Sequence, residues 1–484
     1  MLQIYVTGLG SSYEIEHLTR LFYADAAISA VPVHGKADLV RAAWGKRSLL
    51  TAVRIGGVCH IVRSALPQPL QDKPDFVLAT QLFHLLCRVT GSMPPWGLLT
   101  GVRPVRLVHD MAHEGKTNAE IHNVFRHKFF ANEQKTDLAM QIAENQAPFM
   151  HGGHPRAYSL YISIPFCPSR CSYCSFVSRT TAQSKNIIEP YMQKLCEEIV
   201  AIRRTAERNR LQLATIYIGG GTPTAISAAQ LEKLLATVQA NFNLAAVQEY
   251  TVEAGRPDCT TPEKLALMKM YGVTRISINP QTLCDDVLAA IGRKHSAADI
   301  IACFHAARSA GHTNINMDLI AGLPKDTVDG FAKSLAGVMA LQPENITVHT
   351  LTLKRASNIV IENRAEDYAD VAAMLEKCAV LPQHGWQPYY LYRQKKTLQN
   401  LENTGYTKQG FAGLYNIYIM EEVHTILAAG AGASTKLVQP GGKIERIFNH
   451  KYPLEYIERF DVVLQRKEGV DAFYARNLDT ETPC

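Results

Sequence analysis

Long apolar runs and dense clusters of one charge are both missing from this sequence of 484 residues. No apolar stretch approaches the ~18 residues that suggest a membrane-spanning helix. No run of Lys and Arg resembles a nucleic-acid-binding arm. The opening stretch MLQIYVTGLGSSYEIEHL lacks the basic start of a signal peptide. We therefore expect a cytoplasmic protein with no membrane span and no nucleic-acid partner.

A disulfide framework is also unexpected, because eleven cysteines is an odd number and the cytoplasm keeps thiols reduced. Eight cysteines are scattered singly, and we expect most of them to be small buried residues: Cys59, Cys87, Cys196, Cys259, Cys284, Cys303, Cys378 and Cys484. The other three stand together in FCPSRCSYCSF, spaced C-x3-C-x2-C: Cys167, Cys171 and Cys174.

The bulk composition, 47% hydrophobic and 19% charged residues, is that of a globular protein. The net charge of +6 is spread along the chain. It is compatible with a mildly basic surface or with a basic pocket for an anionic substrate. Composition does not separate these two interpretations.

Short apolar runs alternate with longer amphipathic stretches through the middle of the chain. The expected strands are SLYISI, TIYI, EYTVEA, TRISIN, INMDLI and NITVHTL. This order predicts a parallel sheet with helices outside, an α/β fold in the form of a partial (β/α)6 barrel. We expect three domains: an N-terminal α+β domain (1–150), the barrel core (151–375) and a short C-terminal region completing the core (376–484).

The three clustered cysteines suggest a metal centre with an open position. Iron–sulfur clusters normally take four thiolates, so three leave one iron of a [4Fe–4S] cluster free to bind a ligand. Pro165 and Pro168 keep the surrounding loop from forming a regular helix. The alternative is a zinc site completed by a distant Cys or His.

The motif C-x3-C-x2-C with an aromatic residue before the last Cys resembles the radical S-adenosylmethionine (SAM) enzymes. GGGTPT (219–224) resembles the SAM-binding glycine motif of that family, where glycines allow close approach of the backbone. The resemblance implies a [4Fe–4S] cluster on Cys167, Cys171 and Cys174. Its open iron would bind the amino and carboxylate groups of SAM, and an electron would cleave SAM to a 5′-deoxyadenosyl radical.

Further stretches narrow the resemblance to the oxygen-independent coproporphyrinogen III oxidase family: YISIPFCPSRCSYC, VEAGRPD, ISINPQTL, IGRKH and MDLIAGLP. PWGLLTGVRP and PYYLYRQKKTLQNLENTGY resemble its HemZ-type branch. The family implies oxidative decarboxylation of two propionates of coproporphyrinogen III to vinyl groups, giving protoporphyrinogen IX. It also implies an electron donor such as flavodoxin or ferredoxin.

The resemblance places two SAM molecules side by side. The first maps onto Tyr161, Gly220 and Glu253. The second maps onto Tyr173, Gly221, Thr222, Gln281, Arg293, Asp318 and Thr352. Each position also has a plain structural alternative: a salt bridge for Glu253, a turn cap for Asp318, and solvation for Gln281 and Arg293.

A substrate with four carboxylates needs cations to hold it. The candidates are Arg103, Arg106, Arg393, Lys395 and Lys396, and Trp96 is a candidate to face the tetrapyrrole. The alternative is that Trp96 packs in the core of its own domain and that the cations are solvated or pair with other residues.

Two positions depart from the founding oxidases of the family. Phe176 stands where they have a further Cys, and Tyr173 where they usually have Phe. The Cys-x-Phe form also occurs in relatives that bind and deliver haem, although GLYNIYIMEE lacks their HNxxYW-type motif. A haem-binding or haem-delivery protein, or a radical SAM enzyme acting on haem such as a ring-opening methyltransferase, therefore remains an alternative.

Overall fold

The computed structural model describes residues 2–33, 35, 37–66, 73–101, 103–150, 156–176, 178–354, 357–361, 370–395, 397–439 and 443–477. Lys396, Cys484 and residues 151–155 of the expected interdomain junction lie outside these ranges. The chain forms two compact units. The first is Met1–Gln141 with Arg393–Leu401, and the second is Ile142–Tyr392 with Glu402–Cys484.

These units differ from the three expected domains. Residues 142–150 belong to the second unit, and 393–401 belong to the first. The strands on both sides of residue 375 share one sheet.

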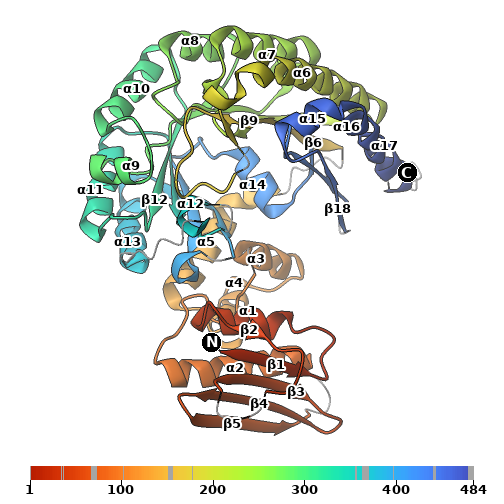
Figure 1. Ribbon diagram of the computed structural model, residues 1–484, viewed down its shortest axis with the longest axis vertical. Helices are drawn as coiled ribbons and strands as arrows, with labels where there is room; N and C mark the ends of the chain where they lie inside the picture. The colour runs from red at the N-terminus through yellow and green to blue at the C-terminus, as the bar shows by residue number, and fades with distance from the viewer. Residues whose placement is uncertain are drawn as a thin grey trace. The chain divides into compact units, whose positions relative to one another are not determined.

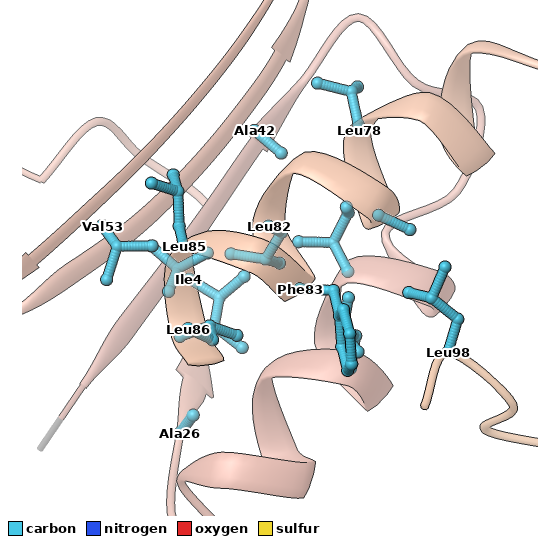
Figure 2. Close-up of a cluster of buried hydrophobic side chains, with 14 of the residues drawn as sticks. Ile4, Ala26, Ala42, Val53, Leu78, Leu82, Phe83, Leu85, Leu86 and Leu98 are labelled. Atoms are coloured by element: carbon cyan, nitrogen blue, oxygen red, sulfur yellow. The ribbon is translucent and has the colours of Figure 1, made fainter. Parts of the chain in front are cut away.

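The first unit is built on a five-stranded sheet in the order β2-β1-β3-β4-β5. Its strands are β1 (Gln3–Thr7), β2 (Ala27–Ile28), β3 (Leu39–Trp44), β4 (Ser48–Ile55) and β5 (Val58–Ala65). Two helices, α1 (Tyr13–Phe22) and α2 (Pro74–Thr90), pack against the sheet. Figure 2 shows the core between them, where Leu82 and Phe83 of α2 meet Ile4 and Val53 of the sheet. The expected α+β fold of this region is confirmed.

Further helical segments follow in the N-terminal half, and the last of them is the longest. They are α3 (Pro104–His113), α4 (Asn118–Asn123), a π-helical turn (Val124–Lys128) and α5 (Glu133–Met150), which runs from the first unit into the second. Thr117 and Glu120 form a capping box that begins α4.

The second unit contains one eleven-stranded sheet in the order β14-β15-β13-β12-β11-β10-β9-β6-β16-β17-β18. Its parallel centre comprises β6 (Ala157–Ile164), β9 (Gln212–Gly220), β10 (Glu249–Glu253), β11 (Arg275–Ser277), β12 (Ile315–Ala321) and β13 (Asn345–Thr350). Among the described strands the two edges, β14 and β18, do not pair with each other. The sheet is therefore an open, partial barrel, as the sequence predicts.

The C-terminal part extends this sheet at both edges. β14 (Gln387–Arg393) and β15 (Glu402–Thr407) lie beyond β13, where β15 is antiparallel. β16 (Thr425–Ala429) runs parallel to β6, followed by antiparallel β17 (Ser434–Val438) and β18 (Ile444–Phe448). Two short strands, β7 (Phe166–Cys167) and β8 (Arg179–Thr180), form a separate pair.

Helices run along the outer side of the parallel strands, as Figure 1 shows for α6, α7, α8 and α10. They are α6 (Lys185–Arg208), α7 (Ala228–Asn241), α8 (Pro262–Met270), α9 (Asp285–Ala290), α10 (Ala297–Ser309) and α11 (Val328–Ala340). The later helices are α12 (Asn358–Ile361), α13 (Val371–Glu376), α14 (Leu414–Glu421), α15 (Pro453–Glu458), α16 (Phe460–Arg466) and α17 (Glu468–Asn477). In the part of the chain that the structure describes, no helix has the length and apolarity to cross a membrane.

Side chains alternate between the two faces of each parallel strand, so that a set of polar side chains shares the inner face of the sheet. The register aligns Tyr161 with Tyr217, and Glu253 with Ser277. Because the strands are parallel, their carboxyl ends lie at one edge of the sheet, where reactive groups collect in such folds.

Candidate functional site

The loop with the three cysteines leaves the carboxyl end of β6 and is tied down by backbone hydrogen bonds. The N–H of Thr181 donates to the carbonyl of Cys167 (2.9 Å), and the N–H of Ser172 donates to the carbonyl of Ile291 (3.0 Å). Cys167 and Cys171 are buried and Cys174 is half-buried. The loop is therefore held in place by the ends of neighbouring elements.

The three sulfur atoms do not lie close enough together in this structure to coordinate a single zinc ion directly. A tetrahedral zinc ion with Zn–S bonds of about 2.3 Å would bring its sulfurs within ~3.8 Å of one another. The Sγ atoms of Cys167, Cys171 and Cys174 do not all lie within 4.8 Å of one another. Burial raises the pKa of the Cys174 thiol to about 11, so bound iron must displace its proton. These residues fit a [4Fe–4S] cluster.

Arg256 places a positive charge beside the cysteine loop. Its guanidinium donates to the carbonyl and hydroxyl oxygens of Ser169 (3.1 and 3.0 Å) and lies 3.9 Å from the Sγ of Cys171. Asp258 fixes the guanidinium through two hydrogen bonds of 3.0 and 2.7 Å. Arg256 lies in the stretch VEAGRPD, but it was not singled out in the sequence, because one arginine after a strand has no distinctive signal.

The glycine motif packs directly on the cysteine loop. A Cβ at Gly221 would lie 3.0 Å from the Sγ of Cys167 and 2.7 Å from the carbonyl oxygen of Phe166, so no larger residue fits there. Gly220 has φ +112°, which strongly favours glycine. The hydroxyl of Thr222 lies 3.5 Å from the Cys167 sulfur. The predicted glycine and threonine positions are therefore adjacent to the predicted cluster ligands.

Glu253, at the end of β10, lies in a tyrosine-lined part of the inner face. Its carboxylate accepts a hydrogen bond of 2.7 Å from the Tyr217 hydroxyl. The Tyr217 ring stacks on Tyr161 and on Tyr415, with centroids 6.2 and 4.5 Å apart. Burial raises the pKa of Glu253 to about 7, although the hydrogen bond from Tyr217 opposes this effect. Tyr217 was not singled out in the sequence, where it is one of twenty tyrosines.

Three residues expected at the second SAM position form one network. Arg293 donates to the Tyr173 hydroxyl (3.2 Å), and that hydroxyl donates to Oε1 of Gln281 (3.2 Å). Arg293 also donates to the carbonyls of Gly255 and Asn279. Gln281 is buried, so the solvated alternative is wrong for Gln281. Tyr173 links this network to the cysteine loop, because it directly precedes Cys174.

Asp318 belongs to a second network on the inner face. It accepts a hydrogen bond from Asn316 (2.7 Å) and lies 3.6 Å from Nε2 of His349, whose Nδ1 lies 3.2 Å from the Tyr392 hydroxyl. Burial disfavours its charge, but His349 and Asn316 bring the pKa of Asp318 below its usual value. Thr352, just beyond β13, donates to the carbonyl of Thr350 (3.4 Å).

His349 was not singled out in the sequence. Its signal is the alternation in NITVHT, which places the histidine on the inner face.

The expected substrate-holding residues that the structure describes lie in the first unit, and two of them have structural roles. Trp96 is only 1% exposed, so the prediction that it faces a tetrapyrrole is wrong. The buried Arg393 guanidinium lies 5.6 Å from the centroid of the Trp96 ring. It donates to the carbonyls of Leu99, Gly101 and Asn400. Arg393 therefore holds the 393–401 segment on the PWGLLTG stretch, and it is removed from the substrate candidates.

The other three described cations are less buried than Arg393. Arg106 pairs with Asp110 on the surface of α3 (2.8 Å). Nζ of Lys395 lies 3.1 Å from Nε2 of His17. Arg103 precedes α3 and lines a cavity of about 420 Å³ in the first unit.

Comparisons with known proteins agree with this geometry. The family model of the Radical SAM superfamily matches residues 161–336. The oxygen-independent coproporphyrinogen-III oxidase-like protein HemZ of Bacillus subtilis is 40% identical over 390 residues, which cover 78% of this chain and 77% of HemZ. The heme chaperone HemW of Haemophilus influenzae is 31% identical over 305 residues, covering 62% of this chain and 75% of HemW.

A solved structure supports the fold. Coproporphyrinogen III oxidase (HemN) from Escherichia coli, described as a radical SAM enzyme, superposes with a TM-score of 0.52 at 24% identity. The match covers 66% of this chain and 73% of HemN. Radical SAM proteins carry a [4Fe–4S] cluster and use SAM, and the cysteine loop fits the cluster. This chain therefore belongs to the radical SAM superfamily, within the family of oxygen-independent coproporphyrinogen-III oxidase-like HemZ proteins.

Proposed function

We propose that this protein oxidatively decarboxylates two propionates of coproporphyrinogen III to vinyl groups, giving protoporphyrinogen IX without oxygen. One observation carries the proposal. The cysteine loop, the glycine motif and Glu253 meet at the carboxyl ends of β6, β9 and β10. That arrangement matches the positions implied by the family resemblance.

In this proposal Cys167, Cys171 and Cys174 would hold the cluster, and the bound cluster would supply the electron for cleavage of SAM. Glu253 accepts both ribose hydroxyls of the first SAM, a role suited to a carboxylate at a strand end. Gly220 lets the backbone approach the ligand closely, and Tyr161 lines the same pocket. The charge of Arg256 offsets the negative charge of the thiolates.

The network of Tyr173, Gln281 and Arg293 supports a second SAM beside the cluster. Arg293 offers the positive charge that a carboxylate of this molecule requires. Gly221, Thr222, Asp318 and Thr352 complete the proposed set. His349 keeps Asp318 ionised, so that Asp318 acts as an acceptor.

In the proposed reaction a hydrogen atom passes from the β-carbon of a propionate to the 5′ carbon of the deoxyadenosyl radical, which gives 5′-deoxyadenosine. The substrate radical then loses CO2 and passes one electron to a one-electron acceptor, which leaves the vinyl group. The stacked rings of Tyr161, Tyr217 and Tyr415 line the inner face and keep water from the reacting carbon. Arg103, Arg106 and Lys395 remain proposed partners of the substrate propionates. Flavodoxin or ferredoxin is the proposed electron donor.

Haem binding and delivery is the second candidate function. Two observations favour it: Phe176 occupies the position of the further Cys, and several relatives are heme chaperones. In that case the cluster would regulate haem transfer and the protein would not turn over a porphyrinogen.

Anaerobic incubation distinguishes the two functions. The reconstituted protein is mixed with SAM, dithionite and coproporphyrinogen III, and the tetrapyrroles are oxidised and analysed by mass spectrometry. We expect repeated turnover with loss of two CO2 per substrate, and none with the matched variant Cys167→Ala. Stoichiometric haem binding together with an unchanged porphyrinogen would instead support haem delivery.

A further inference from the structure

Phe176 is an unusually exposed aromatic side chain beside the predicted cluster. It lies two residues after Cys174, yet it is 65% exposed. Only Ser175 separates Phe176 from the predicted cluster ligand Cys174 in the chain. A short path therefore runs from a thiolate of the cluster to a ring on the protein surface.

The exposed ring borders an open groove of about 570 Å³ between the end of the cysteine loop and α15. Two further apolar side chains of the groove are exposed, Tyr452 by 55% and Leu454 by 44%. A local group of exposed apolar side chains of this kind marks an interaction site more often than isolated ones do.

Cations surround the apolar group. Arg170, Arg179 and Lys451 line the groove and are exposed. Two carboxylates, Glu455 and Glu458, also line it. Glu455 is engaged by Nδ1 of His450 at 2.9 Å and by Arg459 at 3.9 Å, so the positive charges predominate.

We propose that Phe176, Tyr452 and Leu454, with Arg170, Arg179 and Lys451, form the docking surface for an acidic one-electron carrier protein. The carrier loses one electron and the cluster gains it through the segment between Phe176 and Cys174; no atom is transferred. This inference rests on the cluster of the proposed function, but not on the identity of the tetrapyrrole.

The geometry favours a protein over a small ligand. Pockets for small ligands usually bury 70–90% of the ligand surface, whereas this groove is open and its apolar residues lie on the surface. Redox partners form small interfaces with a charged rim and an apolar centre. Opposite charge on the carrier would steer it to the side of the protein nearest the cluster.

Binding of a purified acidic flavodoxin to the full-length, cluster-loaded protein tests the surface directly. The dissociation constant is measured by calorimetry at low and high salt. We expect Arg179→Glu with Lys451→Glu to weaken binding about tenfold at low salt and to reduce its salt dependence. We expect Phe176→Ser to weaken binding at both salt concentrations.

Matched controls change similar residues elsewhere in the same unit. Lys333→Glu reverses an exposed charge on α11, away from α15 (Figure 1), and Met270→Ser removes an exposed apolar side chain of α8. Both should leave the dissociation constant unchanged. Unchanged affinity in the groove variants, or an equal loss in the controls, would overturn the proposal.

SAM cleavage separates this inference from the proposed function. With dithionite as reductant, the groove variants should cleave SAM as the native protein does; with reduced flavodoxin, they should be about tenfold slower at low carrier concentration. If the native protein fails to cleave SAM with dithionite, the proposed function fails. If the groove variants lose affinity for coproporphyrinogen or haem and keep their affinity for flavodoxin, the groove takes a tetrapyrrole and the docking proposal is wrong.

Discussion

Replacing Cys167, Cys171 or Cys174 by alanine is expected to lower the iron content from ~4 atoms per chain to nearly none. Each thiolate holds one iron, and one iron already lacks a protein thiolate. Loss of another ligand therefore leaves half of the irons without a protein anchor. Iron and sulfide analysis of anaerobically purified protein, with its visible absorption, measures the effect.

The scattered cysteines provide matched controls for this result. Cys59→Ala and Cys284→Ala remove thiols far from the motif in the sequence and should leave iron, sulfide and absorption unchanged. Zinc in the native protein, or iron retained when all three cysteines are replaced by alanine together, would contradict the cluster. The spacing of the three Sγ atoms in this structure already argues against a single zinc ion.

Replacing Glu253 by glutamine is expected to weaken SAM binding by about 10- to 150-fold with the cluster intact. The reason is that a hydrogen bond to a charged acceptor contributes ~1.5–3 kcal/mol, and the neutral amide loses most of this advantage. Calorimetric titration of the cluster-loaded protein with SAM measures the loss. Iron content serves as the control that the cluster remains, and unchanged affinity would remove Glu253 from the site.

The pH dependence of SAM binding provides a second test of Glu253. Its pKa of about 7 in the ligand-free protein means that the carboxyl is protonated below neutral pH. A protonated carboxyl must lose its proton before it accepts both hydroxyls. Affinity should therefore fall as pH decreases through 7, by at most ~tenfold per unit, and level off above pH 8.

Two variants separate this effect from the titration of SAM itself. Glu253→Gln should abolish the part of the pH dependence that arises from the protein. Tyr217→Phe removes the hydrogen bond that lowers the pKa of Glu253, so the fall in affinity should begin at higher pH. Identical pH profiles for the native protein and both variants would contradict this role.

The parallel core was predictable because alternation and β-branched residues mark strands such as 159–164 and 315–320. The assignment of Arg393–Leu401 to the first unit was not, because it depends on tertiary hydrogen bonds from Arg393 to Leu99 and Gly101. The extension of the sheet by β14–β18 also depends on long-range strand pairing, which local patterns do not reveal.

The site was predictable where spacing carries information, as for the cysteines and the glycines. Arg256 and Tyr217 were missed because a single arginine or tyrosine has no distinctive pattern. For His349 the alternation in NITVHT indicates only the face of the strand and no role. For Trp96 the sequence left two alternatives open, a face toward the tetrapyrrole and packing in the core of its own domain. The same indole packs equally well in a domain core, and that is where the structure places it.

Transfer of deuterium from the substrate to the 5′ carbon derived from SAM shows directly whether this protein abstracts the β-hydrogen of a propionate. Coproporphyrinogen III with deuterium at the β-carbons of its propionates is incubated anaerobically with SAM, dithionite and the cluster-loaded protein. We expect one deuterium in the 5′-deoxyadenosine formed for each propionate that becomes a vinyl group. 5′-Deoxyadenosine without deuterium, or haem bound without any turnover of the porphyrinogen, would contradict this expectation.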